Sequence, residues 1–510
     1  MKLIVLALLF TAANSARILG MFPFPSISHQ FVFRAIVKEL ALRGHEVTFI
    51  TPNPMKEDEL KNITQIDISE TYQIFEDFDL KKAFTLPSII DWLTNTTGFW
   101  NRLMSMGMDV EGVKDILNKP ENSYDLIIAE VASPIFYGFQ HKFKVPMIAV
   151  SSSALVTPIH KIMGNPVHPI LYPDVRLGYV NPLTDIVHKI KSFFVYYIFY
   201  PVFNFFVTPQ IDKLARSYFG GDMPYITDFF RNVSLVFGNV NPIMSDRRPL
   251  TPNVKEVWNI HMKTPKTLPA DLQKILDDAK NGVIYFSLGT NVRFQYVDEN
   301  FKEDVLKALG DLPYTVLCKW EKEDFPGKPK NVILRKWLPQ QSILAHPNVK
   351  VFVTQGGLQS SEEAIRNGIP LVVIPFRGDQ PWNAKILTNR GMAETVLPES
   401  LTEDLLKQAI LKVVKDEKYG LKAKEFRDIF LDQPRTGLEE IVWWCEYVIR
   451  HKGAHHLRSP GADIPFYEYF MLDVLAVILV TSYGIFQVVN HIMNLIRFLR
   501  KNKTVKHKEK

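Results

Sequence analysis

The sequence predicts an α/β protein with two doubly wound domains that face each other across a cleft, followed by one transmembrane helix. Short apolar runs typical of buried strands alternate with amphipathic stretches in two parts of the chain, and this alternation predicts parallel sheets. The chain has 510 residues, too many for a single hydrophobic core, so two domains are expected. A long apolar block near the C-terminal end predicts the membrane helix.

The first alternation lies in residues 16–240, the expected N-terminal domain. Gly44 ends its first helix, and a strand follows at once, which completes a βαβ unit. Residues 187–208 are unusually aromatic, and three interpretations stay open: helices that wall a lipophilic pocket, helices that lie against a membrane, or plain core. The expected elements are strands over 17–22, 45–50, 124–129 and 145–151, and a helix over 28–43.

Residues 241–275 are rich in proline, and we expect them to be a linker. The second alternation follows in residues 276–450, the expected C-terminal domain. Its expected elements are strands over 283–288, 314–319, 332–334, 349–354 and 371–375, and helices over 300–310 and 358–367.

Both ends of the chain have the composition of membrane-targeting segments. Residues 1–15 combine one basic residue, an apolar run and small residues, which predicts a signal peptide; the alternative is a buried first strand. Residues 470–496 are long enough to span a bilayer, and the basic tail 497–510 that follows indicates the cytosolic side; the alternative is a buried helix. We therefore expect single-pass type I topology, with a lumenal juxtamembrane segment at 451–469.

The net charge of +6 does not predict a nucleic-acid partner, because all of it lies in residues 497–510, which hold seven basic residues and one acidic residue. Lys506 and Lys508 resemble a dilysine retrieval signal of the endoplasmic reticulum; a plain stop-transfer tail is the alternative. Asn62, Asn95 and Asn232 lie in N-glycosylation sequons, which supports a lumenal location only weakly.

Several classes of protein are disfavoured by what the sequence lacks. It contains no GxGxxG, GxxxxGK[ST], HExxH or GxSxG motif, which argues against dinucleotide-dependent oxidoreductases, P-loop NTPases, zincins and common serine hydrolases. Cys318 and Cys445 are the only cysteines, so a disulfide scaffold or a cysteine-rich metal site is excluded, whereas one bridge between them stays open. We expect no metal site.

Residues 337–380 contain the groups that could bind a nucleotide sugar. Gly357 precedes the predicted helix 358–367, whose first backbone N–H groups would suit a phosphate. Trp337 offers a face on which a base could stack, worth ~1–3 kcal/mol, and Gln340 could contact the edge of that base. Taken singly, each residue is at least as well explained as core or as a helix cap. The other candidates are Ser360 at the helix start, Glu363 for ribose hydroxyls, and Asp379 with Gln380 for sugar hydroxyls.

This segment resembles the signature of the UDP-glycosyltransferases, and the similarity extends to residues 286–290, 453–457 and the membrane span, most of all to the insect branch. The resemblance implies a GT-B fold of two Rossmann-like domains, with a lipophilic acceptor bound by the N-terminal domain and UDP-sugar by the C-terminal domain. It also implies roles for individual residues. Trp337 and Gln340 would contact uracil, Glu363 ribose, Asp379 and Gln380 the sugar, and Ser287, Gly289, Thr290, Gln355, Gly357, Gln359 and Ser360 would complete the UDP site.

The same resemblance identifies His29 as the general base. His29 lies in the first turn of a predicted helix, where the helix dipole disfavours imidazolium, as a base requires. Three positions depart from the family pattern. Gln355 stands where most members have histidine, Glu130 stands in place of the aspartate that supports the base, and residues 258–259 replace a glycine pair.

The resemblance implies an enzyme of the endoplasmic reticulum membrane that transfers a sugar, most simply glucose, from UDP to a hydroxyl of a small lipophile. Inversion, no metal ion and no cofactor besides the UDP-sugar are expected, with a role in detoxification or in hormone or pigment conjugation. The alternative, suggested by Gln355 and Glu130, is a non-catalytic relative that binds lipophiles. The acceptor, the donor sugar (glucose, glucuronate or galactose) and the formation of a homo-oligomer stay open.

Overall fold

A computed structural model describes residues 15–56, 61–77, 89–174, 186–245, 248–290, 292, 297–320 and 327–506. The chain divides into two units, Met1–Arg458 and Ser459–Lys510. The predicted signal peptide, apart from Ser15, and Lys508 of the predicted retrieval signal lie outside the described residues.

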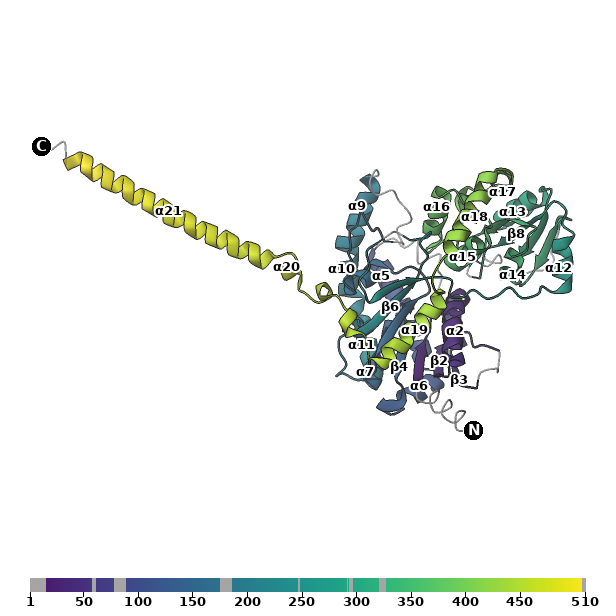
Figure 1. Ribbon diagram of the computed structural model, residues 1–510, viewed down its shortest axis with the longest axis horizontal. Helices are drawn as coiled ribbons and strands as arrows, with labels where there is room; N and C mark the ends of the chain where they lie inside the picture. Colours follow the sequence, from purple (N-terminus) through teal and green to yellow (C-terminus); the bar gives the residue numbers. More distant parts are fainter. Residues whose placement is uncertain are drawn as a thin grey trace. The chain divides into compact units, whose positions relative to one another are not determined.

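The first unit contains two parallel sheets (Figure 1). The first sheet has the strand order β3-β2-β1-β4-β5-β6-β7, so the order reverses between β1 and β4. Its strands are β1 (Arg17–Met21), β2 (Glu46–Thr51), β3 (Ile63–Asp67), β4 (Leu126–Glu130), β5 (Met147–Ser151), β6 (Val233–Asn239) and β7 (Val254–Val257).

The second sheet has the order β10-β9-β8-β11-β12-β13, which is the 3-2-1-4-5-6 order of a Rossmann domain. Its reversal point lies between β8 and β11. Its strands are β8 (Val283–Ser287), β9 (Thr315–Lys319), β10 (Val332–Arg335), β11 (Val349–Thr354), β12 (Leu371–Val373) and β13 (Ala393–Thr395). The helices of this half are α12 (Ala270–Asp277), α13 (Glu299–Gly310), α14 (Gln340–Leu344), α15 (Leu358–Asn367), α16 (Gln380–Asn389), α17 (Glu403–Lys415) and α18 (Glu417–Leu431).

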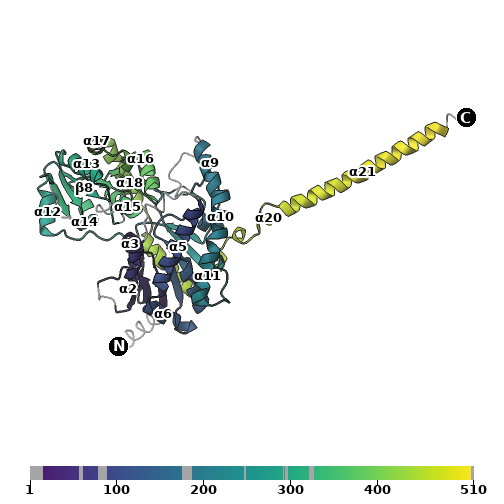
Figure 2. The same cartoon turned by 180° about the vertical axis from the view of Figure 1, so that it is seen from behind.

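Helices cover both faces of the first sheet. Helix α2 (Ile27–Leu42) buries one stripe, which includes Val32, Phe33, Ile36 and Leu40 at helical spacing, and Phe33 stacks on Phe22 with ring centroids 4.3 Å apart. The opposite face is covered by α5 (Ile89–Met108), α6 (Glu111–Leu117) and α7 (Gly138–Phe143), and α11 (Thr208–Phe219) packs beside α5 (Figure 2).

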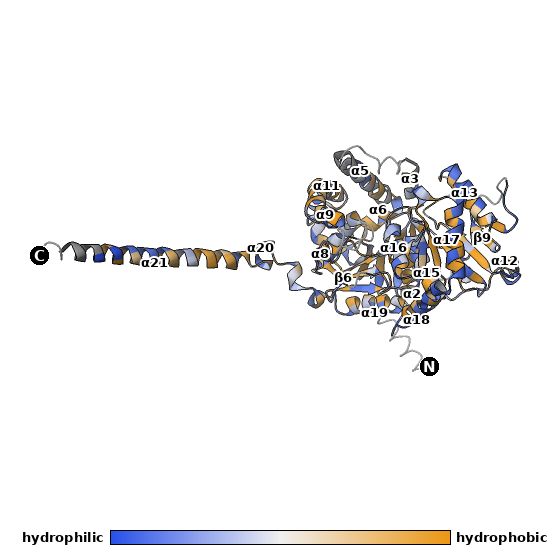
Figure 3. Ribbon diagram, turned by 90° about the horizontal axis from the view of Figure 1, so that it is seen from above, coloured by the Kyte–Doolittle hydropathy of each residue, from blue (hydrophilic) through white to orange (hydrophobic). Residues whose placement is uncertain are grey.

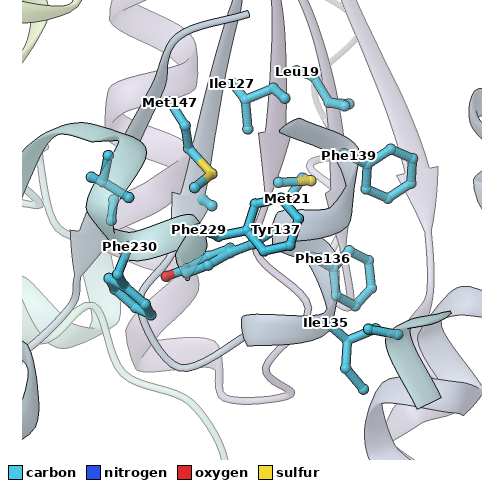
Figure 4. Packing of buried hydrophobic residues seen from close by; sticks show 14 of the residues in the cluster. Leu19, Met21, Ile127, Ile135, Phe136, Tyr137, Phe139, Met147, Phe229 and Phe230 are labelled. Atoms are coloured by element: carbon cyan, nitrogen blue, oxygen red, sulfur yellow. The ribbon is translucent and has the colours of Figure 1, made fainter. Parts of the chain in front are cut away.

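The core on this second face is rich in aromatic side chains. Figure 4 shows Tyr137 and Phe136 lying among Phe229, Phe230 and Phe139 beneath strand residues of β1, β4 and β5. Burial of each such ring stabilises the fold by about 1.5–3 kcal/mol. This core therefore fixes the strand ends from which the site residues project.

Two domain boundaries differ from the sequence prediction. The expected linker 241–275 contains β7, which pairs with β6 in the first sheet, and most of α12. Helix α19 (Gly437–Arg450), assigned to the second domain, packs beside α2 on the first sheet (Figure 1). The reason is its apolar stripe, in which Ile441, Val442 and Cys445 are fully buried. Cys318 and Cys445 form no disulfide with each other, and they lie buried in separate cores.

The aromatic stretch 187–208 forms α9 (Ile186–Phe194), η5 (Val195–Phe199) and α10 (Tyr200–Phe206), continuous with α11. The interpretation as plain core is wrong, because its large side chains are largely exposed, among them Phe205 at 74%. We call this surface the aromatic patch; its members are Ile186, Val187, Ile190, Phe193, Phe194, Tyr197, Ile198, Phe205 and Phe206. Residues 186–219 are also long and apolar enough to cross a membrane.

The second unit consists mainly of α20 (Phe466–Tyr469) and α21 (Leu472–Lys506). Residues 472–500 of α21 are long and apolar enough to span a bilayer, and the predicted span 470–496 lies almost wholly within this helix. Figure 3 shows α21 apolar over its first part and polar towards its C-terminal end.

Candidate active site

Both reversal points are occupied by residues that the sequence singled out. At the first sheet, His29 follows β1 and Glu130 ends β4; at the second, Ser287 ends β8 and Gln355 follows β11. Ligands of doubly wound sheets bind at such points, outside the carboxyl ends of the strands. The two halves meet here, because the Gln359 side-chain amide donates to the carbonyl of Ser152, just after β5, at 2.8 Å.

His29 and Glu130 form a hydrogen-bonded pair. The Nδ1 atom of His29 lies 3.1 Å from Glu130 Oε1, and Glu130 is only 2% exposed. The second carboxylate oxygen, Oε2, accepts the backbone N–H of Phe24 at 3.2 Å, which fixes the carboxylate plane. A carboxylate on Nδ1 holds the imidazole in the tautomer whose Nε2 has a free lone pair. Because the His29 side chain is 28% exposed, the ring remains accessible.

A row of aromatic rings extends from His29. Phe24 lies 5.2 Å from the His29 ring and 5.7 Å from Trp100, and Trp100 lies 5.7 Å from Phe99. The row continues through Phe75 to Tyr72, at 6.2 and 6.4 Å. We call these five residues (Phe24, Trp100, Phe99, Phe75 and Tyr72) the aromatic row. Sequence reasoning missed it, because the residues come from three separate segments; adjacent Phe99 and Trp100 were the available signal.

Two glycines shape the turns around the second reversal point. Gly356 has φ +82°, and a Cβ there would lie 2.6 Å from Val373 Cγ1. Gly289 has φ +72°, and a Cβ there would lie 2.4 Å from the side-chain nitrogen of Gln355. Both positions therefore require glycine. Within the turn that contains Gly289, the Ser287 hydroxyl accepts the Gly289 N–H at 3.3 Å, and half-exposed Thr290 follows.

Helix α15 begins directly after these turns, with Gly357 as its N-cap residue. The first N–H groups of a helix lack intrahelical partners and favour anions. Ser360 lies in the first turn, and its hydroxyl accepts the Gln340 side-chain amide at 3.0 Å. Gln359, which the resemblance assigns to the phosphates, instead uses its amide on Ser152.

Gln355 and Gln380 are both buried and bonded to each other, since Gln380 Nε2 donates to Gln355 Oε1 at 3.2 Å. Gln380 Oε1 accepts the backbone N–H groups of Phe376 and Arg377 at 2.8 and 3.0 Å. The side-chain carbonyl of Gln380 thus holds the backbone of the loop after β12 in place, a structural role that the sequence did not indicate.

The residues expected to contact the nucleobase and the ribose lie close together. Trp337 is 58% exposed, which leaves a ring face open for stacking. Glu363 Oε2 accepts Gln340 Nε2 at 2.6 Å, and Gln340 Oε1 accepts the Tyr285 hydroxyl at 3.1 Å. Lys319, which sequence reasoning missed, has its Nζ 2.5 Å from the Gly289 carbonyl oxygen and 5.5 Å from the centre of the Trp337 ring.

Asp379, expected to hold the sugar, is the N-cap residue of α16 in the loop after β12. Its carboxylate accepts the Asn383 amide at 2.9 Å. Burial raises the pKa of Asp379, and a nearby His29 imidazolium would lower it. The carboxylate expected to hold the sugar therefore lies within electrostatic range of the expected base.

The three sequons differ in their surroundings. Asn62 is disfavoured as a glycan acceptor, because its amide nitrogen already donates to the carbonyls of Ala41 and His45, both at 2.7 Å. Asn95 is exposed on α5, and Asn232 is exposed just before β6.

Comparison with known proteins shows the family of this chain. The family model described as "UDP-glucoronosyl and UDP-glucosyl transferase" matches residues 21–508. The chain belongs to the UDP-glycosyltransferases. UDP-glucosyltransferase 2 of Dactylopius coccus is 34% identical over 487 residues, which cover 94% of this chain and 93% of that protein. The ecdysteroid UDP-glucosyltransferase of Spodoptera littoralis nuclear polyhedrosis virus is 32% identical over 513 residues, or 95% and 98% of the two chains.

Solved structures confirm the GT-B fold of this UDP-glycosyltransferase. The crystal structure of the glycosyltransferase VinC in complex with dTDP has a TM-score of 0.57 and 15% identity, and it covers 85% of this chain and 100% of that chain. Its family membership shows that this protein is an enzyme that uses a nucleotide-sugar donor and an acceptor.

Proposed function

We propose that the enzyme transfers glucose from UDP-glucose to a hydroxyl of a small lipophile, in detoxification or in hormone or pigment conjugation. The observation that supports this most is the His29–Glu130 pair, in which a buried carboxylate faces Nδ1 of an accessible imidazole. His29 Nε2 takes the hydroxyl proton as the acceptor oxygen bonds to the anomeric carbon. The bond from that carbon to the phosphate oxygen breaks on the opposite face, so the configuration inverts and UDP leaves.

Charge on the departing UDP is stabilised by groups of this chain in the proposed reaction, without a metal ion or a further cofactor. The N–H groups at the start of α15 and the ammonium of Lys319 beside the Gly289 turn are assigned to the diphosphate. Trp337 stacks on uracil, and Glu363 accepts ribose hydroxyls. Glucose is the favoured sugar because the relatives described above are named glucosyltransferases.

A lipophilic, flat acceptor is supported by the aromatic row next to His29. Rings stack best on flat apolar or aromatic molecules, and the row starts at the base itself, through Phe24 at 5.2 Å. Trp100 and Phe99 are half-buried, so part of each ring is available to a bound molecule.

The test uses full-length enzyme in microsomes with radiolabelled UDP-glucose and a phenol acceptor. His29→Ala should lower turnover by roughly 10²–10⁴-fold while UDP still binds. His141→Ala is the matched control, because His141 is paired with a surface carboxylate, Asp222, at 3.6 Å and should keep parental turnover. Near-normal turnover of His29→Ala would remove His29 from the mechanism. A parent that binds UDP and lipophiles but transfers no sugar would identify the non-catalytic alternative.

We also propose a single-pass type I protein of the endoplasmic reticulum, with the aromatic patch against the lumenal membrane surface. The patch is apolar and exposed, and Lys189 and Lys191 beside it suit anionic lipid headgroups. Because Cys318 and Cys445 are buried, a fluorophore on Phe205→Cys can be made site-specific. Spin-labelled lipids should quench it, but not the same probe on Leu421→Cys, which is 63% exposed on α18. Equal quenching at both sites would contradict this orientation.

A further inference from the structure

A buried imidazole lies between two adjacent carboxylates at the start of the segment that joins the two sheets. His261 Nε2 is 3.3 Å from Glu363 Oε1, and His261 Nδ1 is 3.8 Å from Glu362 Oε2. The side chains of His261 and Glu362 are fully buried, and that of Glu363 is 7% exposed. Two neighbouring carboxylates without a cation would be costly at this depth.

The pKa directions agree with an imidazolium here. Burial lowers the pKa of His261, but the interaction with Glu363 and the charges of both carboxylates outweigh it, so the pKa is raised overall. Burial raises the pKa of Glu362 to about 7. Of the two carboxylates, Glu363 has the oxygen nearer to the imidazole, at 3.3 Å against 3.8 Å for Glu362, and Glu363 is the residue assigned to ribose.

Three groups hold the Glu363 carboxylate. Gln340 Nε2 donates to Oε2 at 2.6 Å, and Gln341 Nε2 donates to Oε1 at 2.9 Å. His261 approaches the same Oε1 from the linker, and the linker also fixes Gln341, because the Lys263 N–H donates to Gln341 Oε1 at 3.0 Å. The two glutamines belong to α14 next to the base site, whereas His261 is the only one of the three that comes from the linker.

We propose that His261 is a positioning residue for the donor: its imidazole holds Glu363 in the orientation that accepts ribose hydroxyls, and so connects the interdomain linker to UDP-sugar recognition. This inference rests on the proposed function. Glu362 connects the same helix to the first sheet, because its Oε1 accepts the Asn241 amide at 3.2 Å. Arg366, one turn later on α15, donates to Asn259 Oδ1 at 2.6 Å. The linker thus contacts α15 at successive turns.

The test measures discrimination between UDP and its 2′-deoxy and 3′-deoxy analogues, by calorimetry on the full-length protein in nanodiscs. A hydroxyl that donates to the Glu363 carboxylate should make UDP bind about 10- to 150-fold more tightly than the analogue that lacks it. His261→Asn places its amide near the Nδ1 position and cannot reach Glu363. His261→Gln extends its amide to the Nε2 position and can donate to Glu363.

We expect the Asn variant to lose most of the discrimination, to within about threefold of unity, and the Gln variant to keep most of it. A merely structural role would weaken UDP and the analogues equally. His346→Asn is the matched control, since His346 is also buried and paired with a carboxylate, Asp277, at 3.0 Å outside the site. It should leave the discrimination unchanged.

The inference would be overturned if folded His261→Asn discriminated UDP from its deoxy analogues as well as the parent does. It would also be overturned if His261→Asn and His261→Gln lost this discrimination equally. A parent that binds UDP without discriminating the analogues would also overturn it, by removing Glu363 from ribose binding while leaving the proposed reaction intact. Failure of the parent to bind UDP at all would instead refute the proposed function on which the inference rests.

Discussion

Replacing Glu130 by glutamine tests whether this carboxylate supports the base. In the parent, Oε1 faces His29 Nδ1 at 3.1 Å and Oε2 accepts the Phe24 N–H at 3.2 Å, so both oxygens act as acceptors. An amide has only one oxygen. If that oxygen stays on the Phe24 N–H, the amide NH₂ faces Nδ1 and moves the imidazole proton to Nε2, the atom that must take the acceptor's proton.

The opposite amide orientation directs NH₂ against the Phe24 N–H. Leaving this half-buried donor unpaired costs ~1–3 kcal/mol, so this orientation is the minor one by about 5- to 150-fold. Loss of the negative charge also removes stabilisation of the imidazolium that forms during transfer. Together we expect Glu130→Gln to lower kcat by roughly 10²–10³-fold.

The assay is transfer of radiolabelled glucose at saturating donor, with UDP affinity measured in parallel. UDP affinity should stay within about twofold, because Glu130 lies in the first sheet and contacts none of the donor residues assigned above. Glu130→Asp keeps the negative charge on a side chain that is one methylene shorter, and it should retain partial activity. Parental turnover of Glu130→Gln on a good acceptor would refute the reasoning, and the partner of His29 would have to be sought elsewhere.

Three further changes give distinct outcomes. Trp337→Ala should weaken uridine and UDP alike by about 5- to 150-fold, the loss of ~1–3 kcal/mol of stacking; unchanged uridine binding would contradict stacking. Lys319→Met keeps the alkyl chain and should weaken UDP roughly tenfold or more but leave uridine unchanged, and equal effects on both ligands would exclude a diphosphate contact. In the parent, burial raises the pKa of the Glu362 carboxyl from 4.5 to about 7. This raised pKa stabilises the folded parent fully below pH 4.5, and the stabilisation is lost as the pH rises to about 7. Glu362→Gln removes the titrating group. The stability of the parent relative to Glu362→Gln should therefore fall by up to ~3 kcal/mol over this range in urea titrations, and a pH-independent difference would show that Glu362 titrates normally.

The sequence predicted the two parallel sheets, because strands buried on both faces are continuous apolar runs and the helices between them have clear apolar stripes. It also indicated the residues at both reversal points, since Ser287 lies at the end of a predicted strand and His29 lies at the start of the helix that follows one. Those positions depend only on local alternation and on the rule that parallel strands end at one edge.

What the sequence did not predict depends on contacts between distant segments. Helix α19 has an ordinary amphipathic pattern, and nothing local indicates that Cys445 packs beside α2 on the first sheet. Strand β7 is only four residues long and lies among prolines, so its pairing with β6 was hidden. His261 is a lone histidine in a proline-rich segment, and its relation to Glu363 appears only when the linker passes α15.

The central claim is transfer of a sugar from UDP to a lipophilic hydroxyl with inversion, and the most direct test is the identity of the product. Full-length enzyme in microsomes would be incubated with phenols, steroids and flavonoids and with UDP-glucose, UDP-glucuronate or UDP-galactose. NMR of the purified conjugate would then assign its anomeric configuration. We predict a β-glucoside from α-linked UDP-glucose that His29→Ala does not form at a comparable rate. An α-glucoside, or no conjugate with any donor from protein that binds UDP, would contradict the account.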